Sequence, residues 1–149
     1  MGESLYLEDL HVGRRFTSRA VTLDQDRIET FAREFDPQPF HLDEAAARAS
    51  VFGGLVASGW HTACVSMRLM VESVPLANGL IGFGVEVSWP RPTRPGDTLR
   101  VESEVLEVVP SRSKPERGTV TARSTTLNQH GEAVCVIVAR MMAFRRPLA

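Results

Sequence analysis

A carboxylate and an imidazole stand five positions apart in the segment Phe35-Asp36-Pro37-Gln38-Pro39-Phe40-His41-Leu42-Asp43. Such a pair suits a reaction in which one group takes a proton from water and the other delivers a proton to a neighbouring carbon. Hydration of a carbon–carbon double bond conjugated to a carbonyl is a reaction of this kind, and it requires both groups in fixed geometry. Because proline fixes φ, we expect a stiff loop that presents Asp36 and His41 to one point.

A second candidate is the segment Gly54-Leu55-Val56-Ala57-Ser58-Gly59-Trp60-His61, where small residues lead into an apolar stretch with helical period. The first four amides of a helix lack internal partners and carry the positive end of its dipole. We therefore expect the Gly59 N–H to stabilise charge that builds on a carbonyl oxygen. Losing such a donor typically raises a barrier by about 3 to 4 kcal/mol.

Each polar residue here also has a purely structural interpretation. Asp36 could simply end a helix through a local turn bond, and His41 could be a satisfied, partly buried histidine. Asp43 is better interpreted as the cap of a short helix than as a third acid. His61 lies one turn into the apolar helical stretch that begins at Ser58-Gly59. We interpret it as a polar residue that faces a second copy of the chain.

The helices that hold these residues are predicted from capping signals and from apolar residues at helical spacing. Thr22 with Gln25 forms a possible capping box, so a helix should start there and end at Asp36-Pro37. A short helix is expected over residues 43–50 and a long one from Ser58-Gly59 to about Val74. The long helix shows little polar surface, so it should be nearly enclosed. One face of the first helix carries Ile28, Phe31, Ala32 and Phe35, and the stripe of the long helix comprises Trp60, Ala63, Cys64, Met67, Met70, Val71 and Val74.

The remaining chain predicts strands. Alternation over residues 81–89 indicates a half-buried strand, and a change of phase at Leu106 indicates a bulge in the strand that follows the turn at 94–97. The expected strands cover residues 15–21, 81–89, 99–108, 119–127 and 133–144, the last of them covered on both faces. This order favours an α+β fold in which an antiparallel sheet wraps around the long helix.

Composition excludes several function classes. With 149 residues, 43% of them hydrophobic and 23% charged, the chain fits one globular domain. Its 17 basic and 18 acidic residues give no net field for a nucleic acid or an anionic membrane. Cys64 and Cys135 lie in apolar runs, as buried free thiols do, and we expect a reducing compartment. We find no signal peptide or apolar run that could span a bilayer, so we expect a cytoplasmic protein.

Taken together, these motifs resemble a known family. The stretches 36–43 and 52–59 are similar to the hydratase signature of MaoC-like dehydratases and R-specific enoyl-CoA hydratases, and residues 91–99 resemble their strand-turn motif. The resemblance extends from about Tyr6 to Phe144. It implies a single MaoC-like hot-dog domain over residues 1–149, in which a curved antiparallel sheet wraps around a long central helix. It also implies a homodimer or higher oligomer, an acyl tunnel near the subunit interface, and catalysis without metal or redox cofactor.

The same resemblance assigns residues to roles. Asp36 and His41 would be the catalytic pair, and the Gly59 amide would be the oxyanion donor. The substrate-binding residues would include Phe52, Ser58 and Trp60. Two positions depart from the family, because many members carry asparagine where Gln38 stands and histidine where Ser58 stands. A serine that orients the site in many hydratases falls here near Ser66 or Met67.

The loop over residues 110–117 concentrates three cations between prolines. Arg112 and Lys114 could hold coenzyme A phosphates, since both provide charge-assisted donors. A solvated loop between strands is the alternative interpretation of this segment. The two interpretations differ in whether these cations lie near the acyl site.

The predicted reaction is hydration of a trans-2-enoyl-CoA thioester, or the reverse dehydration, as in fatty acid metabolism. The sequence does not divide acid and base duties between the two side chains, nor does it fix the acyl chain. A hot-dog acyl-CoA thioesterase is the first alternative, since one fold hosts both reactions. A catalytically inactive acyl-CoA-binding or partner subunit is the second.

Overall fold

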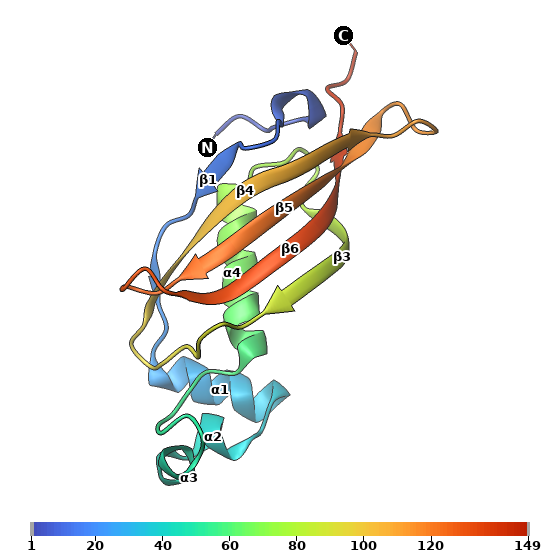
Figure 1. Cartoon of the computed structure of the whole chain (residues 1–149). Helices are drawn as coiled ribbons and strands as arrows, with labels where there is room; N and C mark the ends of the chain where they lie inside the picture. The colour runs from blue at the N-terminus through green and yellow to red at the C-terminus, as the bar shows by residue number, and fades with distance from the viewer. Residues whose placement is uncertain (1, 149) are drawn as a thin grey trace.

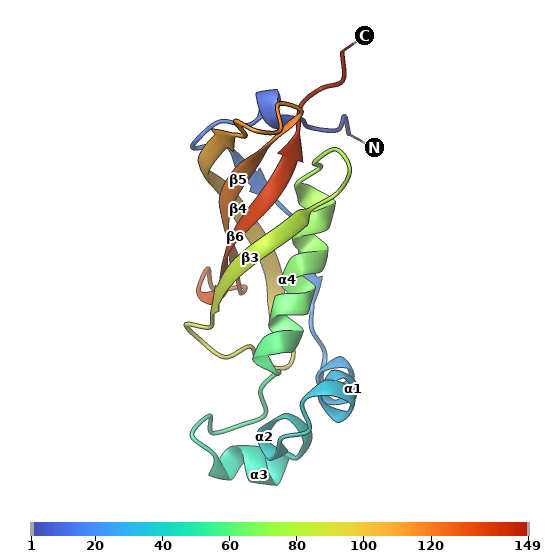
Figure 2. The same ribbon diagram turned by 90° about the vertical axis from the view of Figure 1, so that its right-hand side faces the viewer.

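The structure, a computed structural model, describes residues 2–148 and consists of an antiparallel sheet with one long helix across one face (Figures 1 and 2). The sheet order is β1-β4-β5-β6-β3, and β2 pairs separately with β4. This arrangement confirms the predicted α+β class and hot-dog fold, although the sheet stays open. Met1 and Ala149, which the predicted domain includes, lie outside the described residues. The strands are β1 (Arg15–Thr17), β2 (Val21–Thr22), β3 (Ile81–Ser88), β4 (Thr98–Pro110), β5 (Arg117–Leu127) and β6 (Ala133–Phe144).

The helices confirm most of the predicted ends. A 3-10 turn, η1 (Leu7–Asp9), precedes the sheet, and the helices are α1 (Gln25–Phe35), α2 (Pro39–Leu42), α3 (Glu44–Ala49) and α4 (Gly59–Ser73). Asp36 ends α1, and the Asp43 side chain caps α3 by accepting from Ala45 N–H, both as predicted. The bulge predicted in β4 is also confirmed, since the register shifts between Val105 and Glu107.

Two predictions about the first helix are wrong. Thr22 lies in β2, and Asp24 caps α1 instead by accepting from Arg27 N–H at 2.8 Å. Val21 and Thr22 pair with β4, so Thr22 is not available as a cap. Aspartate is as good a cap as threonine, and Asp24 takes this position. Phe35, predicted on the buried face, is 66% exposed because it lies in the last turn, beyond the reach of the core.

The loop predicted between Asp36 and Asp43 contains the short helix α2. Pro39 opens it at the first helical position, where the missing N–H costs nothing and φ is already helical. The two prolines therefore stiffen this segment by starting a helical turn. Helices α1 to α3 lie together at one end of the sheet (Figure 1).

The long helix α4 is not enclosed as predicted. Its sheet side buries Leu69 and Met70 against Val101 and neighbouring strand residues, but Trp60 and Val71 on the outer side are 59% and 51% exposed. The reason is that the open sheet covers only one side of the helix. Cys64 is exposed for the same reason, whereas Cys135 is buried as predicted.

Hydroxyl pairs join α4 to strand β5 and to the loop between β3 and β4. Ser66 Oγ lies 2.5 Å from Thr126 Oγ1, and Thr62 Oγ1 donates to Thr93 Oγ1 at 3.0 Å. Buried polar groups require such partners. These bonds fix the rotation of α4 about its axis, and hence the direction of its first turn.

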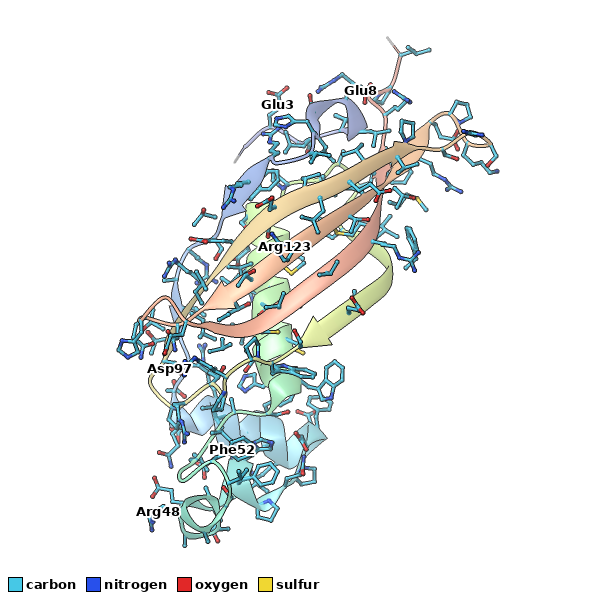
Figure 3. All side chains as sticks on the ribbon, in the orientation of Figure 1. Glu3, Glu8, Arg48, Phe52, Asp97 and Arg123 are labelled. Carbon is cyan, nitrogen blue, oxygen red and sulfur yellow. The ribbon has the colours of Figure 1, made fainter. Side chains whose placement is uncertain are left out.

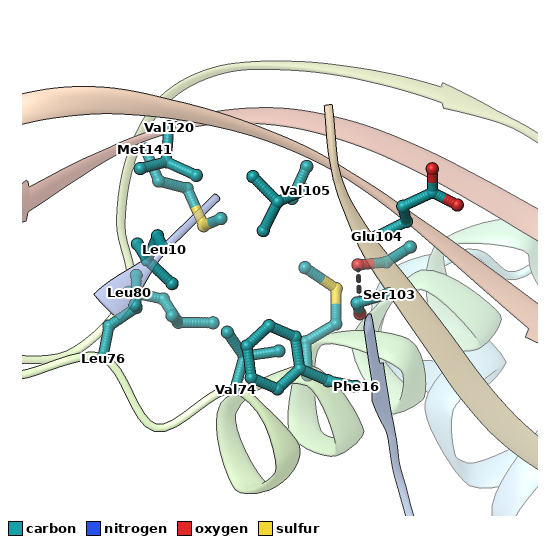
Figure 4. A pocket seen from close by; sticks show the side chains of 13 residues that line it. Leu10, Phe16, Val74, Leu76, Leu80, Ser103, Glu104, Val105, Val120 and Met141 are labelled. Atoms are coloured by element: carbon teal, nitrogen blue, oxygen red, sulfur yellow. Dashed lines mark hydrogen bonds between the residues drawn. The ribbon is translucent and has the colours of Figure 1, made fainter. Parts of the chain in front are cut away.

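The far end of α4 packs on a purely structural core. A cavity of about 10 Å³ remains there, among Leu10, Phe16, Val74 and Met141 (Figure 4). Its apolar lining offers no partner to a water molecule, so we expect it to be dry. Strand β6, predicted to be covered on both faces, alternates buried with half-buried residues because α4 covers only one face of the sheet. In residues 2–148, no helix is long and apolar enough to cross a bilayer.

Candidate active site

Asp36 and His41 meet at the junction of α1 and α2. The His41 Nε2 atom lies 3.2 Å from Asp36 Oδ2, and His41 is only 4% exposed. The other ring nitrogen, Nδ1, lies 2.7 Å from the Val56 carbonyl oxygen. Because a carbonyl oxygen only accepts, Nδ1 carries a proton, and Nε2 is the nitrogen that exchanges protons with its surroundings.

The Asp36 carboxylate accepts hydrogen bonds from two side chains. Ser58 Oγ donates to Oδ2 at 2.7 Å, and Gln38 Nε2 donates to Oδ1 at 2.6 Å. Burial raises the pKa of Asp36, but the bonds from Ser58 and Gln38 and the proximity of His41 outweigh burial, so the pKa lies below its usual value. The group is therefore a carboxylate near neutral pH.

Ser58 occupies the N-cap position of α4 without capping it. An N-cap serine usually accepts from an amide in its own first turn, but the Ser58 hydroxyl is directed at Asp36 instead. Among the described residues, no side chain takes its place at this helix end. The first amides of α4, including that of Gly59, are left for a ligand.

A cleft of about 530 Å³ opens in front of these groups. Its lining includes Asp36, His41 and Gly59, so it joins the acid/base pair to the helix end. This volume lies in the range of small-molecule sites. Phe40 packs edge-on against both His41 and Phe52, with ring centroids 4.7 and 5.2 Å apart. The aromatic part of the wall comprises Phe40, Phe52, Trp60 and Trp89.

Trp89, between β3 and β4, is a site residue that the sequence reasoning missed. Its indole N–H donates to the Gly59 carbonyl oxygen at 2.7 Å, and its ring meets Trp60 edge-on with centroids 5.3 Å apart. A Cβ atom on Gly59 would lie 2.8 Å from Trp89 Cε2, so only glycine fits there. The alternating pattern predicted Trp89 as the last residue of a strand. No local sequence pattern indicates its contact with Gly59.

The predicted substrate-binding residues divide into two groups. Phe52 and Trp60 line the cleft, and Ser58 lies behind it, fully buried against Asp36. Phe52 lies at the helical end of the molecule (Figure 3). Arg112 and Lys114 lie on the turn between β4 and β5, at the opposite end of the sheet from α1 to α3 (Figure 1).

Within one chain, that position contradicts a shared site for Arg112, Lys114 and the Asp36–His41 pair. The 13 residues of β4 carry the turn away from the cleft, over roughly 40 Å at the usual rise of a strand. The cation that does line the cleft is Arg91, whose Nη1 lies 3.4 Å from Glu132 Oε2. Arg91 is the first residue of the strand-turn motif and was visible in the sequence, but cations near strand ends usually only contact water.

Three other residues weighed from the sequence lie outside the cleft. Ser66 is buried on the side of α4 that faces the sheet, and Met67 is exposed on the outer side of the helix. His61 does not face outward as predicted: it is 8% exposed and stacks on Phe31, with centroids 4.5 Å apart and planes at 4°. The reason is that α1 crosses the first turn of α4 and covers the imidazole.

Comparisons with known proteins agree with this fold. The family model described as a MaoC like domain matches residues 10–128. The crystal structure of a MaoC-like dehydratase from Rhodospirillum rubrum superposes with a TM-score of 0.96 at 60% identity, covering 97% of this chain and 100% of that one.

Two curated relatives are also similar to this chain. YdeM, an uncharacterized protein of Bacillus subtilis strain 168, is 34% identical over 126 residues, which are 83% of this chain and 87% of YdeM. An (R)-specific enoyl-CoA hydratase of Rhodospirillum rubrum is 27% identical over 136 residues, covering 91% of this chain and 93% of the relative. Both alignments therefore span nearly the full length of each protein.

Proposed function

Because this chain belongs to the family of the MaoC like domain, we propose that it hydrates a trans-2-enoyl-CoA thioester to a 3-hydroxyacyl-CoA, or catalyses the reverse dehydration. One observation carries this proposal: the Asp36 carboxylate lies 3.2 Å from His41 Nε2 at a cleft that also reaches Gly59. The relative named (R)-specific enoyl-CoA hydratase supports the substrate class.

In this proposal the thioester carbonyl oxygen accepts from the Gly59 N–H. Negative charge grows on that oxygen as water attacks C3, and the unpaired amide at the positive end of α4 stabilises it. The acyl chain then lies along the aromatic wall formed by Phe52, Trp60 and their neighbours. The carboxylate and imidazole face the double bond from one side.

Asp36 and His41 divide the proton transfers as their hydrogen bonds suggest. Asp36, ionised at neutral pH, takes a proton from the attacking water, whose oxygen bonds to C3. In the reacting state His41 carries a proton on both ring nitrogens, and it gives the Nε2 proton to C2 as the enolate collapses. The Val56 carbonyl holds Nδ1–H throughout and keeps the ring oriented.

After one turnover Asp36 holds the extra proton and His41 Nε2 lacks one. The two atoms are 3.2 Å apart, so the proton can return directly once the product leaves. Water adds one hydrogen and one hydroxyl to the substrate, and the pair ends in its starting state. No metal or redox cofactor is needed in this scheme.

The experiment that tests this proposal follows two signals in one reaction. Purified protein is mixed with trans-2-enoyl-CoA thioesters of increasing chain length, and the enoyl absorbance and free thiol are recorded. We expect the absorbance to fall without release of thiol. Thiol release at the same rate would favour a thioesterase, and binding without turnover would favour an inactive acyl-CoA-binding subunit.

We also propose that two copies of the chain associate. Strand β3 is an edge strand, yet Phe83 and Val85 on it are 52% and 62% exposed, as is the outer side of α4 at Trp60. An apolar edge strand next to an apolar helix stripe usually marks an interface. A second copy would cover both surfaces at once, beside the cleft wall formed by Trp60 and Trp89.

A further inference from the structure

A second groove, of about 470 Å³, lies between α1, α4 and the segment from Arg19 to Leu23. It has no lining residue in common with the catalytic cleft. Residues one turn apart on α4, His61, Val65 and Leu69, form one wall, and Phe31 of α1 forms another. The groove therefore spans the contact between the helix that ends at Asp36 and the helix that begins at Gly59.

The charged part of the groove is entirely cationic. Arg19, Arg27 and Arg68 line it, and none of its lining residues is acidic. Arg19 and Arg68 share one carboxylate, Glu72, through nitrogen–oxygen distances of 2.8 and 2.9 Å. Within residues 2–148, Arg27 makes no ion pair. Three guanidinium groups face one carboxylate, which leaves a positive groove.

His61 supplies the second, independent observation. It is buried, it lines the groove, and its Nδ1 atom has no hydrogen-bond partner among the described residues. Burial first, and then the charge of Arg27, lower the pKa of His61, so the ring is neutral. A neutral imidazole has one N–H to donate, and a buried polar group without a partner is unfavourable. Because Nδ1 itself is buried, a ligand oxygen in the groove would meet the imidazole at Nε2, or at Nδ1 after a turn of the ring.

We propose that this groove binds a small organic phosphate, which would bridge α1 and α4. Its phosphate oxygens would accept from Arg27, Arg68 and a ring nitrogen of His61, because guanidinium forks match phosphate geometry. Its organic part would lie on the apolar side formed by Phe31 and Val21. This site goes beyond the proposed hydration and does not depend on it.

The test uses the whole protein labelled with ¹⁵N, with adenosine monophosphate and inorganic phosphate as probes. Each is titrated against potassium chloride of equal ionic strength, and the ring nitrogen signals of His61 and His41 are followed by NMR. We expect a saturable shift at His61. Arg27→Gln and Arg68→Gln should each weaken binding about fivefold, the scale of one exposed charged contact. Arg33→Gln, on α1 outside the groove, serves as the matched control.

The two probes distinguish an organic ligand from the free ion. Tighter binding of adenosine monophosphate than of inorganic phosphate is the expected result, because only the nucleotide reaches the apolar side. Equal affinities would overturn the organic part of the proposal. A shift confined to His41, a shift that does not saturate, or equal affinities in all three arginine variants would overturn the site itself. None of these outcomes requires the protein to be a hydratase.

Discussion

Ser58 stabilises the carboxylate of another segment where an N-cap serine would ordinarily stabilise its own helix. Its hydroxyl donates to Asp36 at 2.7 Å and leaves the first turn of α4 without a side-chain cap. One side chain thus keeps Asp36 ionised and leaves the Gly59 amide free. The serine thus performs both tasks with a single hydroxyl.

The effect of Ser58 on Asp36 gives a pH prediction. Ser58→Ala removes a donor that lowers the Asp36 pKa, so that pKa should rise. Because the ionised carboxylate is the proposed base, the acidic limb of the kcat/KM profile should move to higher pH. The profile is measured with a short enoyl-CoA. An acidic limb that stays in place while the rate falls would contradict this role for Ser58.

Gly59 allows a second test at the residue scale. In Gly59→Ala the new Cβ would lie 2.8 Å from Trp89, so the indole or the helix end must move and the oxyanion donor with it. We expect a loss in kcat of at least about tenfold, because a displaced donor forfeits part of the about 3 to 4 kcal/mol that its complete removal costs. The matched control is Gly82→Ala, where the nearest atom is 3.9 Å away. Equal kcat values for the two variants would refute the argument.

At the scale of elements, local signals predicted where the site's helices end. The local sequence signals were Asp36-Pro37 for the end of α1, Asp43 for the start of α3 and Ser58-Gly59 for the start of α4. All three helix boundaries are as predicted. The predictions failed where contacts with residues distant in the sequence determine the local structure. Thr22 lost its capping role because β2 pairs with β4, and the Trp89–Gly59 bond joins residues 30 positions apart.

The first turn of α4 is also held by the loop between β3 and β4, which gives an element-scale prediction. Thr62 donates to Thr93 at 3.0 Å, and both are buried. Thr62→Val should lower the free energy of unfolding by about 1 to 3 kcal/mol, since it leaves the buried Thr93 hydroxyl unpaired. Thr93→Val should cost less, because the Thr62 hydroxyl still donates to the Ser58 carbonyl oxygen at 3.4 Å. The double variant should lose less than the sum of the two. Urea unfolding measures all three, and strict additivity would mean that the bond contributes nothing.

At the scale of the molecule, the open sheet explains why α4 is not enclosed as predicted. The sequence records an apolar helix, and a single copy of the chain leaves its outer side exposed at Trp60, Met67 and Val71. Periodicity shows that a surface is apolar without showing whether the same chain covers it. The placement of Arg112 and Lys114 could not be predicted either, because strand length and direction, rather than local chemistry, decide it.

Association through β3 is tested by one substitution. Val85→Lys places a charge on the exposed apolar edge strand, and we expect the dimer to dissociate to monomers in size-exclusion chromatography with light scattering. Val109→Lys is the matched control, because Val109 is 46% exposed on β4, away from this edge. A wild-type monomer at micromolar concentration, or a dimer that survives Val85→Lys, would contradict the proposed interface.

The most direct test of the whole account is the enoyl-CoA hydration rate of Asp36→Asn and His41→Ala. Asp26→Asn and His11→Ala, both exposed, are the controls, and circular dichroism checks that every variant folds. We predict that each site variant loses at least roughly a hundredfold in rate, as expected for a general acid or base, while both controls keep the wild-type rate. Near-wild-type hydration by a folded Asp36→Asn or His41→Ala protein would contradict the account.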